Sequence, residues 1–600
     1  MLTSIKIGNF KAFAELQKIP IRPLTLIYGA NSSGKSSILH SLIFARHAQE
    51  TGELNVNCTE VGGEAVDLGG FRQYVHKRNS ELRVQFEWEI GSKSFSRRLD
   101  DLLRGISNVS IGLDIGFSQS DPELMDSVGK MKPKDIVKYL IEESQKRGDD
   151  IEVTKLENYL ETAEDKLTLE EVNKLKSQLG VQSLWLGFDS HKFLSMSRRP
   201  SGNLQVDTLD IEHQFVRYII NNICLAHSTT EKIKKKEIDI LSKSINDLIP
   251  KLSFVPGNLF PKQLFHETRT GEELSKAQFV TVRPETRIDD LKRAVEYQFS
   301  TILEEIVIGI GQSIKNEIGK LTYLGPLRIY PPRHFGLNEQ PHQNWVAGGG
   351  SAWEIARKNS KIRNKLNEWL GNDKKLSTAY ELRIRHLLTI ESIQSKYYDM
   401  VSRAMSILTE DPQDEDGVFK DIHGELELAL DEIPDNLTKL ESLYSDLQEL
   451  VLYDKRTKTP VSHRDVGIGI SQVLPVLATC FASKNKIIAM EQPEIHLHPA
   501  LQAELGDVLI ESAIGENKNT LLIESHSEHI LLRIMRRMRE TSNGQLPEGM
   551  LPITPKDVCV LYVEPDGPRS IVREMPLNEN GELVKAWPGG FFEEGLREIF

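Results

Sequence analysis

The chain has 600 residues, of which 39% are hydrophobic and 27% are charged, and its formal net charge is −13. This composition is ordinary for a soluble globular protein, and the length predicts roughly three or four structural units. The acidic balance argues against a surface that is coated with phosphate-binding groups. Four scattered cysteines predict neither a disulfide framework nor a zinc site: Cys58, Cys224, Cys480 and Cys559.

No apolar run approaches the ~20 residues of a membrane span, and the first residues lack the long apolar core of a signal peptide. We therefore expect a cytoplasmic location and no membrane partner.

A strand, a loop and a helix follow one another near the start of the chain. Ser4 to Phe10 alternates Ile and Lys, and Leu24 to Tyr28 is a short apolar run with β character. Ser37 to His47 has the apolar spacing of a helix. The loop between the second strand and this helix is rich in glycine and serine.

That loop fits the pattern G-x-x-x-x-G-K-[ST] without a mismatch. Its residues, with the one that follows, are Gly29, Ala30, Asn31, Ser32, Ser33, Gly34, Lys35, Ser36 and Ser37. The glycines allow the backbone N–H groups to curl toward phosphate oxygens, and the next helix adds the positive end of its dipole. We expect Lys35 to neutralise the β- and γ-phosphates of ATP and Ser36 to ligate Mg²⁺. The alternative is a strand–helix turn that binds no nucleotide.

The middle of the chain is charged and has helical spacing, over about Lys132 to Gly180 and again over about Ala352 to Tyr453. An acidic break lies at Asp411 to Gly417, and neither tract shows clear sustained heptads. We predict five segments: an N-terminal ATPase lobe (1–115), a mostly helical insertion (116–320), a return to the ATPase core (321–350), a helical arm (351–455) and a C-terminal ATPase lobe (456–600).

A second motif lies far downstream, where the apolar segment Lys486 to Met490 leads into Glu491, Gln492, Pro493 and Glu494. A strand that delivers carboxylates at its end can orient Mg²⁺ and polarise an attacking water. We expect Glu491 to serve the magnesium ion. The alternative is a core strand that ends in an acidic turn.

A third motif precedes this strand by about twenty residues. Gly467, Gly469, Ser471 and Gln472 stand before an apolar helical stretch, a layout that suits a phosphate-binding helix N-terminus. The alternative is a flexible hinge loop.

A fourth motif follows the apolar strand Thr520 to Ile523. His526 stands there in the run Glu-Ser-His-Ser-Glu-His and could form a hydrogen bond with a γ-phosphate. The alternative is a structural histidine in a polar turn.

The end of the chain predicts a helix from His529 to Glu540 and then a β-hairpin, VCVLYVEP and SIVREMPL. Strands at both ends of the chain predict one sheet assembled from both. Four basic residues on the helix could meet nucleic-acid phosphates or pair with carboxylates: Arg533, Arg536, Arg537 and Arg539.

The four motifs, in this order, resemble the ABC-type ATPases of the SMC, OLD and zinc-hook group. Gly29 to Ser36 looks like Walker A, Gly467 to Gln472 like a divergent signature, and Glu491 to Glu494 like Walker B. The D-loop then falls at His496 to Pro499, and His526 looks like the switch histidine.

Several segments show a more specific resemblance. EQPEIHLHP, ESHSEHILLRI and the ending WPGGFFEEGLREIF resemble prokaryotic AAA-family ATPases with a C-terminal domain of unknown function, and Tyr323 to Arg333 is similar to a segment of OLD-like ATPases.

This resemblance implies an α/β ABC-type ATPase head with helical insertions that works as a homodimer or a higher oligomer. ATP would lie between Walker A of one subunit and the signature of the other. It further implies a sensor in a prokaryotic antiviral defence system that controls a separate effector, often a nuclease.

The rival readings are an SMC-like or zinc-hook DNA-repair ATPase, a transporter subunit and an ATP-bound scaffold that does not hydrolyse ATP. The chain lacks the zinc-hook Cys-x-x-Cys, and a long coiled coil is not evident.

The sequence departs from the pattern of these ATPases at two places. The signature is not Ser-Gly-Gly-Gln, and Gln492 stands where most such ATPases carry a catalytic glutamate. Because an amide cannot accept a proton from water as a carboxylate does, we expect slow hydrolysis, or substitution by Glu494. No Asp-x-Asp follows His526, so the nuclease fold of OLD relatives is not expected and neither is nuclease activity.

Overall fold

The computed structural model describes residues 1–118, 179–199, 201–227, 235–266, 287–331, 344–372, 375–387 and 447–590, together with residues 141, 402 and 592. The chain forms two compact units. Unit 1 comprises Met1–Pro326, Lys484–Pro493 and Leu509–Phe600, and unit 2 comprises Leu327–Ser483 and Glu494–Val508. Nearly all of the tract from Lys132 to Gly180, and the whole acidic break at Asp411 to Gly417, lie outside the described residues.

A six-stranded sheet forms the centre of unit 1. Its strands in spatial order are β11 (Leu321–Leu324), β15 (Ile487–Glu491), β16 (Thr520–Glu524), β3 (Leu24–Gly29), β17 (Val558–Asp566) and β18 (Arg569–Glu574). The first five are parallel, and every residue of β3, β15 and β16 is buried. Such strands read as continuous apolar runs because both faces of a parallel sheet are covered. The expected sheet built from both ends of the chain is present, and β11 adds a strand from the middle.

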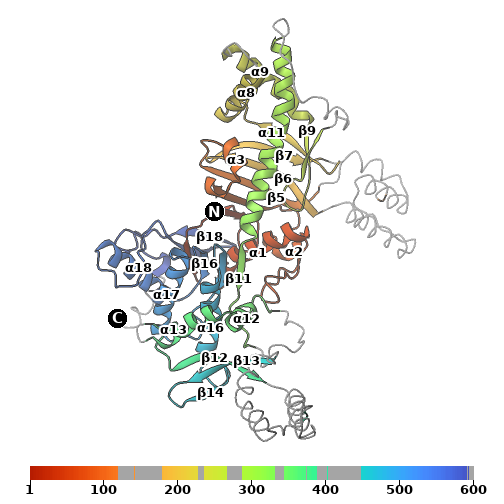
Figure 1. Ribbon diagram of the computed structural model, residues 1–600. Helices are drawn as coiled ribbons and strands as arrows, with labels where there is room; N and C mark the ends of the chain where they lie inside the picture. Colours follow the sequence, from red (N-terminus) through yellow and green to blue (C-terminus); the bar gives the residue numbers. More distant parts are fainter. Residues whose placement is uncertain are drawn as a thin grey trace, which may run out of the picture. The chain divides into compact units, whose positions relative to one another are not determined.

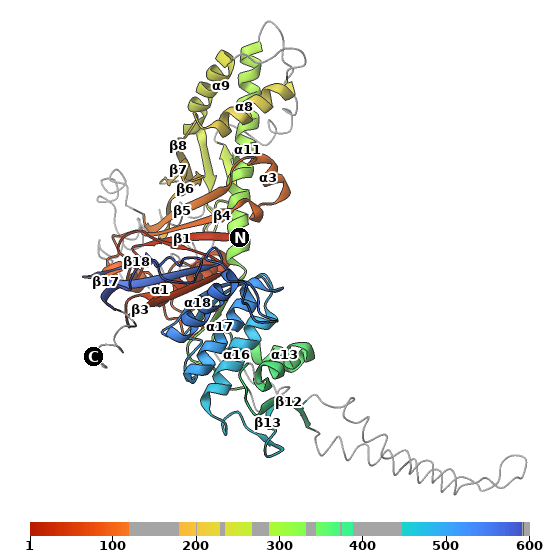
Figure 2. The ribbon, with the colours of Figure 1, turned by 90° about the vertical axis from the view of Figure 1, so that its left-hand side faces the viewer.

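The second sheet of unit 1 has nine antiparallel strands. In spatial order these are β10 (Gln263–His266), β9 (Leu252–Val255), β8 (Leu204–Leu209), β7 (His191–Arg198), β6 (Leu179–Phe188), β5 (Asn108–Phe117), β4 (Val84–Gly91), β1 (Leu2–Gly8) and β2 (Gln17–Pro20). Helix α11 (Arg287–Ile318) runs along this sheet, as Figures 1 and 2 show.

The insertion that the sequence pattern assigned to residues 116–320 contains strands as well as helices. Its described part holds helices α8 (Gln214–His227), α9 (Lys235–Leu248) and α11, but it also holds the five strands β6 to β10. Buried and less buried positions alternate over residues 183–186 of β6 and 194–197 of β7, and both strands carry aromatic residues, over segments too short to show a helical period. The expected boundary at residue 115 falls inside β5.

Three of the described helices connect to or pack against strands of the six-stranded sheet. Helix α1 (Lys35–Thr51) packs against β3, β11, β15 and β16, while α18 (Glu528–Ser542) follows β16. Helix α17 (Pro499–Ile514) begins in unit 2 and ends in unit 1. Two short helices, α2 (Phe71–Tyr74) and α3 (Arg97–Leu102), lie before β4 and between β4 and β5 in the chain. None of the helices in the described ranges has both the length and the apolar character needed to cross a membrane.

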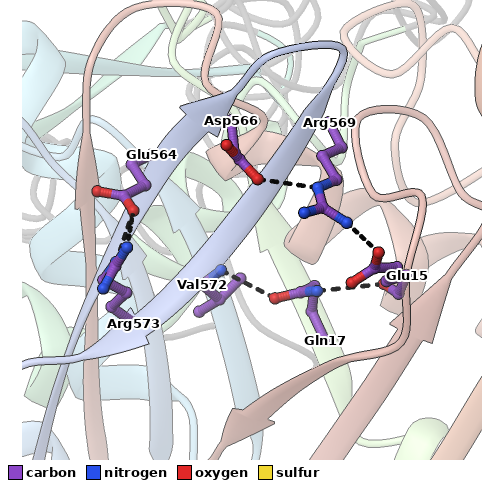
Figure 3. Close-up of polar contacts among 7 residues, drawn as sticks. All are labelled: Glu15, Gln17, Glu564, Asp566, Arg569, Val572 and Arg573. Carbon is purple, nitrogen blue, oxygen red and sulfur yellow. Dashed lines mark hydrogen bonds and ion pairs between the residues drawn. The ribbon is translucent and has the colours of Figure 1, made fainter.

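The predicted C-terminal hairpin is present as β17 and β18, and it is tied to the N-terminal segment (Figure 3). The backbone N–H of Val572 donates to Oε1 of Gln17 in β2 at 3.1 Å. Arg569 pairs with Glu15 and with Asp566. Because these ion pairs are solvent-exposed, we attribute the junction chiefly to the strand packing rather than to its charges.

Unit 2 contains helices and a small sheet. The helices are α12 (Gly350–Lys358), α13 (Ser360–Gly371) and α16 (Ile468–Ala482), and the strands, in order, are β12 (Tyr380–Leu387), β13 (Leu447–Asp454) and β14 (Thr459–Val461). Both α12 and α13 pack on α16. The arm expected over 351–455 therefore includes two helices and an antiparallel strand pair, and most of the residues between β12 and β13 lie outside the described ranges.

Candidate nucleotide site

The phosphate-loop sequence forms the expected turn between β3 and α1. Strand β3 ends at Gly29 and α1 begins at Lys35. Gly34 caps the helix with a φ of 96°, and a Cβ placed there would lie 2.6 Å from Cβ of Ala12. The position therefore requires glycine both for its left-handed backbone and for its close approach to the neighbouring turn.

Lys35 is held against its own loop. The side chain is 4% exposed, and Nζ donates to the carbonyl oxygens of Gly29 at 3.1 Å and Ala30 at 2.8 Å. Nζ also lies 3.9 Å from Oε1 of Glu524. Burial lowers the pKa of Lys35, and the charges of Glu524 and Glu491 oppose that shift.

The carboxylate that contacts Ser36 is Glu524. Oγ of Ser36 donates to Oε2 of Glu524 at 2.7 Å, and Glu524 is 4% exposed. The sequence pattern did not assign a role to this residue, although it ends an apolar strand two positions before His526. In the parallel register of β15 and β16, Glu491 lies opposite Glu524, so both carboxylates end their strands at one edge of the sheet.

Glu491 belongs to a different set of contacts. Its Oε1 accepts a hydrogen bond from Oη of Tyr323 at 2.9 Å and lies 3.2 Å from Nε2 of His40 on α1. Nζ of Lys11 lies 2.8 Å from Nδ1 of the same histidine. These contacts hold the Glu491 carboxylate between β11 and α1, and none of the three partners was predicted.

Burial changes the pKa values of the two basic groups near Glu491, His40 and Lys11. Burial lowers the pKa of His40, and the nearby Lys11 lowers it further, while Glu491 acts in the opposite direction. Burial also lowers the pKa of Lys11 to about 8. A neutral His40 that donates from Nε2 to Glu491 and accepts at Nδ1 from Lys11 satisfies both neighbours.

Gln492 follows β15 directly, where the catalytic glutamate of similar ATPases stands. Its φ is 45°, and its backbone N–H donates to the carbonyl oxygen of Glu524 at 2.8 Å. A left-handed conformation is uncommon for a residue other than glycine, and such positions gather at functional sites. Glu494, the suggested substitute, lies in unit 2, where it is buried and its carbonyl oxygen accepts from the backbone N–H of Leu497.

His526 lies in unit 1, in the loop between β16 and α18, and is half-buried. Burial lowers its pKa, and the positive charge of Lys35 lowers it further, so the imidazole is influenced by the phosphate loop. The next residue, Ser527, accepts at its carbonyl oxygen from Oη of Tyr28 at 3.1 Å. Tyr28 immediately precedes the phosphate loop and thereby joins it to the histidine loop.

The C-terminal segment packs on the same tyrosine. The ring of Tyr28 lies 5.8 Å from that of Trp587 and 5.5 Å from that of Phe592, both in edge-on geometry. Trp587 also lies 5.7 Å from Tyr562 of β17. Trp587 and Phe592 of the WPGGFF run therefore pack against the residue that precedes the phosphate loop.

The signature residues lie in unit 2 at the start of α16. Gly467 caps the helix and is exposed, and Ile468 is 45% exposed. A Cβ on Gly469 would lie 2.6 Å from the carbonyl oxygen of His496, so the helix start and the expected D-loop are in close contact.

Ser471 and Gln472, expected to reach a phosphate, are buried and engaged within unit 2. Oγ of Ser471 donates to the carbonyl oxygen of His463 at 2.8 Å. Gln472 donates from Nε2 to the carbonyl oxygen of Arg328 at 3.0 Å and accepts the backbone N–H of Arg328 at 3.3 Å. The exposed helix start therefore offers backbone N–H groups rather than the side chains of Ser471 and Gln472.

The residues at the phosphate loop fit ATP and Mg²⁺. The buried Oγ of Ser33 has no hydrogen-bond partner among the described residues, as expected for a group that serves a ligand. Magnesium is usually held by one or two carboxylates together with substrate phosphates, and two carboxylates, those of Glu491 and Glu524, end neighbouring strands at this edge. When bound, the ion would neutralise charge that develops on the phosphates.

A family model described as an AAA ATPase domain matches residues 1–531, and a second, described as a protein of unknown function (DUF3696), matches residues 553–600. No curated protein matches.

The solved structures to which this chain is similar include head domains of SMC proteins. The Thermotoga maritima SMC head is 7% identical, with 96% of this chain and 99% of that chain covered and a TM-score of 0.31. The Pyrococcus yayanosii Smc head with a coiled coil and joint is 11% identical, with 96% and 98% covered and a TM-score of 0.31. The Pyrococcus furiosus Smc head bound to the C-terminal domain of ScpA is 9% identical, with 100% and 98% covered and a TM-score of 0.32.

With most of its length matched by one family model, and with the phosphate loop, the parallel sheet and the strand-end carboxylates in place, the chain belongs to the AAA ATPase domain family. It is an α/β P-loop ATPase with a C-terminal domain of unknown function.

Proposed function

We propose that this ATPase hydrolyses ATP slowly, closes into a dimer when ATP is bound, and thereby controls a separate effector protein. The observation that carries the proposal is the composition of one sheet edge. Lys35, Ser36, Glu491 and Glu524 gather there for an ATP–Mg²⁺ complex, yet the residue after Glu491 is Gln492.

Slow ATP turnover follows from the side-chain amide of Gln492. A general base must accept a proton from the attacking water, and a glutamine side chain cannot do so at neutral pH. His526, whose pKa is lowered, would be neutral and would form a hydrogen bond with a γ-phosphate. The site is therefore better suited to holding ATP than to cleaving it rapidly, with Glu494 as the candidate substitute base.

Dimerisation would supply the signature. The exposed start of α16 presents backbone N–H groups and the positive end of the helix dipole, which favour an anion. Because Ser471 and Gln472 are engaged within unit 2, a partner's γ-phosphate would be bound by the backbone near Gly467. ATP would then be the group that joins two subunits.

The effector role rests on the resemblance to ATPases of antiviral defence systems, in which the partner is often a nuclease. In this proposal the ATPase chain itself does not cleave nucleic acid. Cleavage of DNA by the purified protein with Mg²⁺ or Mn²⁺ would contradict that assignment.

The function is tested by measuring ATP binding and phosphate release on the same preparation. We expect bound ATP that depends on Lys35, release of phosphate over many minutes, and slower release for Glu494→Gln. Rapid turnover that Glu494→Gln leaves unchanged would contradict slow hydrolysis.

A second candidate, a scaffold that binds ATP without hydrolysing it, is favoured by Gln492 alone. The time course of phosphate release distinguishes the slow ATPase from the scaffold, because a scaffold retains ATP and releases no phosphate over hours. A marked stimulation of hydrolysis by DNA would instead support a DNA-repair ATPase of the SMC or zinc-hook kind.

A further inference from the structure

We propose that Glu524 is a functional carboxylate of the nucleotide site, which holds Ser36 in position and shares the binding of the divalent cation with Glu491. This inference rests on the proposed function, because it concerns the cation that accompanies ATP. It assigns a residue that the motif pattern leaves without a role.

The contacts of Glu524 are with the two side chains on which the phosphate loop depends. Oε2 accepts the hydroxyl of Ser36 at 2.7 Å, and Oε1 lies 3.9 Å from Nζ of Lys35. A carboxylate that is 4% exposed carries a large desolvation cost unless charge or hydrogen bonds compensate it. Each oxygen of Glu524 thus faces a phosphate-loop group that would itself face ATP.

The backbone fixes Glu524 at this place. It ends the buried strand β16, lies in register with Glu491 on β15 and with Ile27 on β3, and its carbonyl oxygen accepts the N–H of Gln492 at 2.8 Å. Neighbouring parallel strands bring their carboxyl ends to one edge of a sheet, where ligands of α/β folds bind. Glu524 is therefore held between the phosphate loop and the residue that replaces the catalytic glutamate.

The contacts of Glu491 are complementary. Its Oε1 is engaged by Tyr323 and His40 rather than by Ser36. One carboxylate is thus bound to the phosphate-loop hydroxyl and the other is supported from β11 and α1. Magnesium is commonly held through one or two carboxylates, and the orientation of a ligating hydroxyl depends on the group that accepts its hydrogen bond.

The role of Glu524 also has a cost. A second negative charge beside the triphosphate repels the nucleotide unless a cation lies between them. The assignment therefore predicts opposite effects in the presence and absence of Mg²⁺, which a purely structural partner of Lys35 would not produce.

The test is a titration of a fluorescent ATP analogue against the full-length protein, in EDTA and over a range of Mg²⁺ concentrations. We expect Glu524→Gln to bind the analogue in EDTA as tightly as the unaltered protein or more tightly. We also expect the gain in affinity on adding Mg²⁺ to fall by about tenfold or more. The matched control is Glu516→Gln, an exposed carboxylate in the turn before β16, which should behave as the unaltered protein.

A thermal unfolding scan checks that the variants are folded, and Glu524→Asp, which keeps the charge, replaces Glu524→Gln if the latter is not. A shorter carboxylate should raise the Mg²⁺ concentration needed for half of the gain. An unchanged Mg²⁺ dependence in a folded variant overturns the role of Glu524. If the unaltered protein binds the analogue no better than Lys35→Ala does, the proposed function itself fails.

Discussion

The phosphate loop in unit 1 and the signature helix in unit 2 both present the start of a helix, but they are equipped differently. Around the phosphate loop, Lys35, Ser36 and two carboxylates bring charged and hydroxyl side chains to one edge of a sheet. At the signature helix, Ser471 and Gln472 are turned inward, while Gly467 and Ile468 are exposed. The comparison suggests that one region determines affinity for the nucleotide, while the other adds a weak contact that is useful only once ATP is bound.

The largest effect should come from Lys35→Ala. It removes the buried cation of the phosphate loop and leaves Glu524 without its charged neighbour. We expect the affinity for ATP to fall by about a hundredfold or more, because a desolvated charge pair with phosphate is lost. Isothermal titration measures this, with the exposed Lys518→Ala as the control. Undiminished binding would remove the phosphate loop from the site.

Gln492→Glu should restore a base at the strand end. We expect turnover to rise by about tenfold or more, since a positioned base typically contributes 10²–10⁴-fold. Steady-state phosphate release measures the change, and Gln545→Glu in an exposed loop is the control. If turnover stays the same, the amide is not what slows hydrolysis.

Gly467→Glu distinguishes the role of the signature helix from that of the phosphate loop. A Cβ at Gly467 meets no described atom within 4 Å, and an acidic residue at a helix N-terminus is stabilising, so the fold should tolerate it. We expect unchanged ATP binding but at least about a tenfold loss of ATP-dependent dimerisation, because the new carboxylate repels a partner's phosphate. Analytical ultracentrifugation reports the loss, and Gly467→Ala is the neutral control. Equal loss in both variants would point to shape rather than charge.

A smaller effect concerns acid stability of the signature region. Burial lowers the pKa of His463 from 6.5 to about 4, and Glu449 opposes this shift. Because the unfolded state binds the proton more readily, the stabilisation by neutral His463 is complete above pH 6.5 and is lost as the pH falls toward 4. Over that range we expect the free energy of unfolding of unit 2 to decrease by on the order of 2–3 kcal/mol more than in His463→Gln.

The measurement is denaturant unfolding at several pH values followed by tryptophan fluorescence, since Trp353 of unit 2 lies 5.0 Å from the His463 ring. Parallel pH profiles for the two proteins would show that His463 is not the group responsible.

Local patterns were sufficient to predict the elements that hold the motifs. The apolar run before Gly29, the helix after Lys35 and the strand before Glu491 are all present, because a buried parallel strand and a glycine-bounded helix leave short-range signals. The C-terminal hairpin was predicted from local patterns in the same way.

The partners across the fold were not predictable in this way. Tyr323 and His40 both contact Glu491, although they lie 168 and 451 positions before it in the chain. Only the order of the strands brings these residues together. Glu524 was visible in the histidine motif, yet its contact with Ser36 depends on the pairing of β16 with β3. The strands between residues 179 and 266 were missed because they extend a distant sheet begun at the N-terminus.

The most direct test of the account is the molar mass of the protein in solution, measured by light scattering with and without ATP and Mg²⁺. The account predicts that the mass doubles with ATP, stays doubled for many minutes, and does so neither for Lys35→Ala nor for Gly467→Glu. A protein that binds ATP and keeps one unchanged mass would contradict the claim that the phosphate loop and the signature of two subunits complete one site.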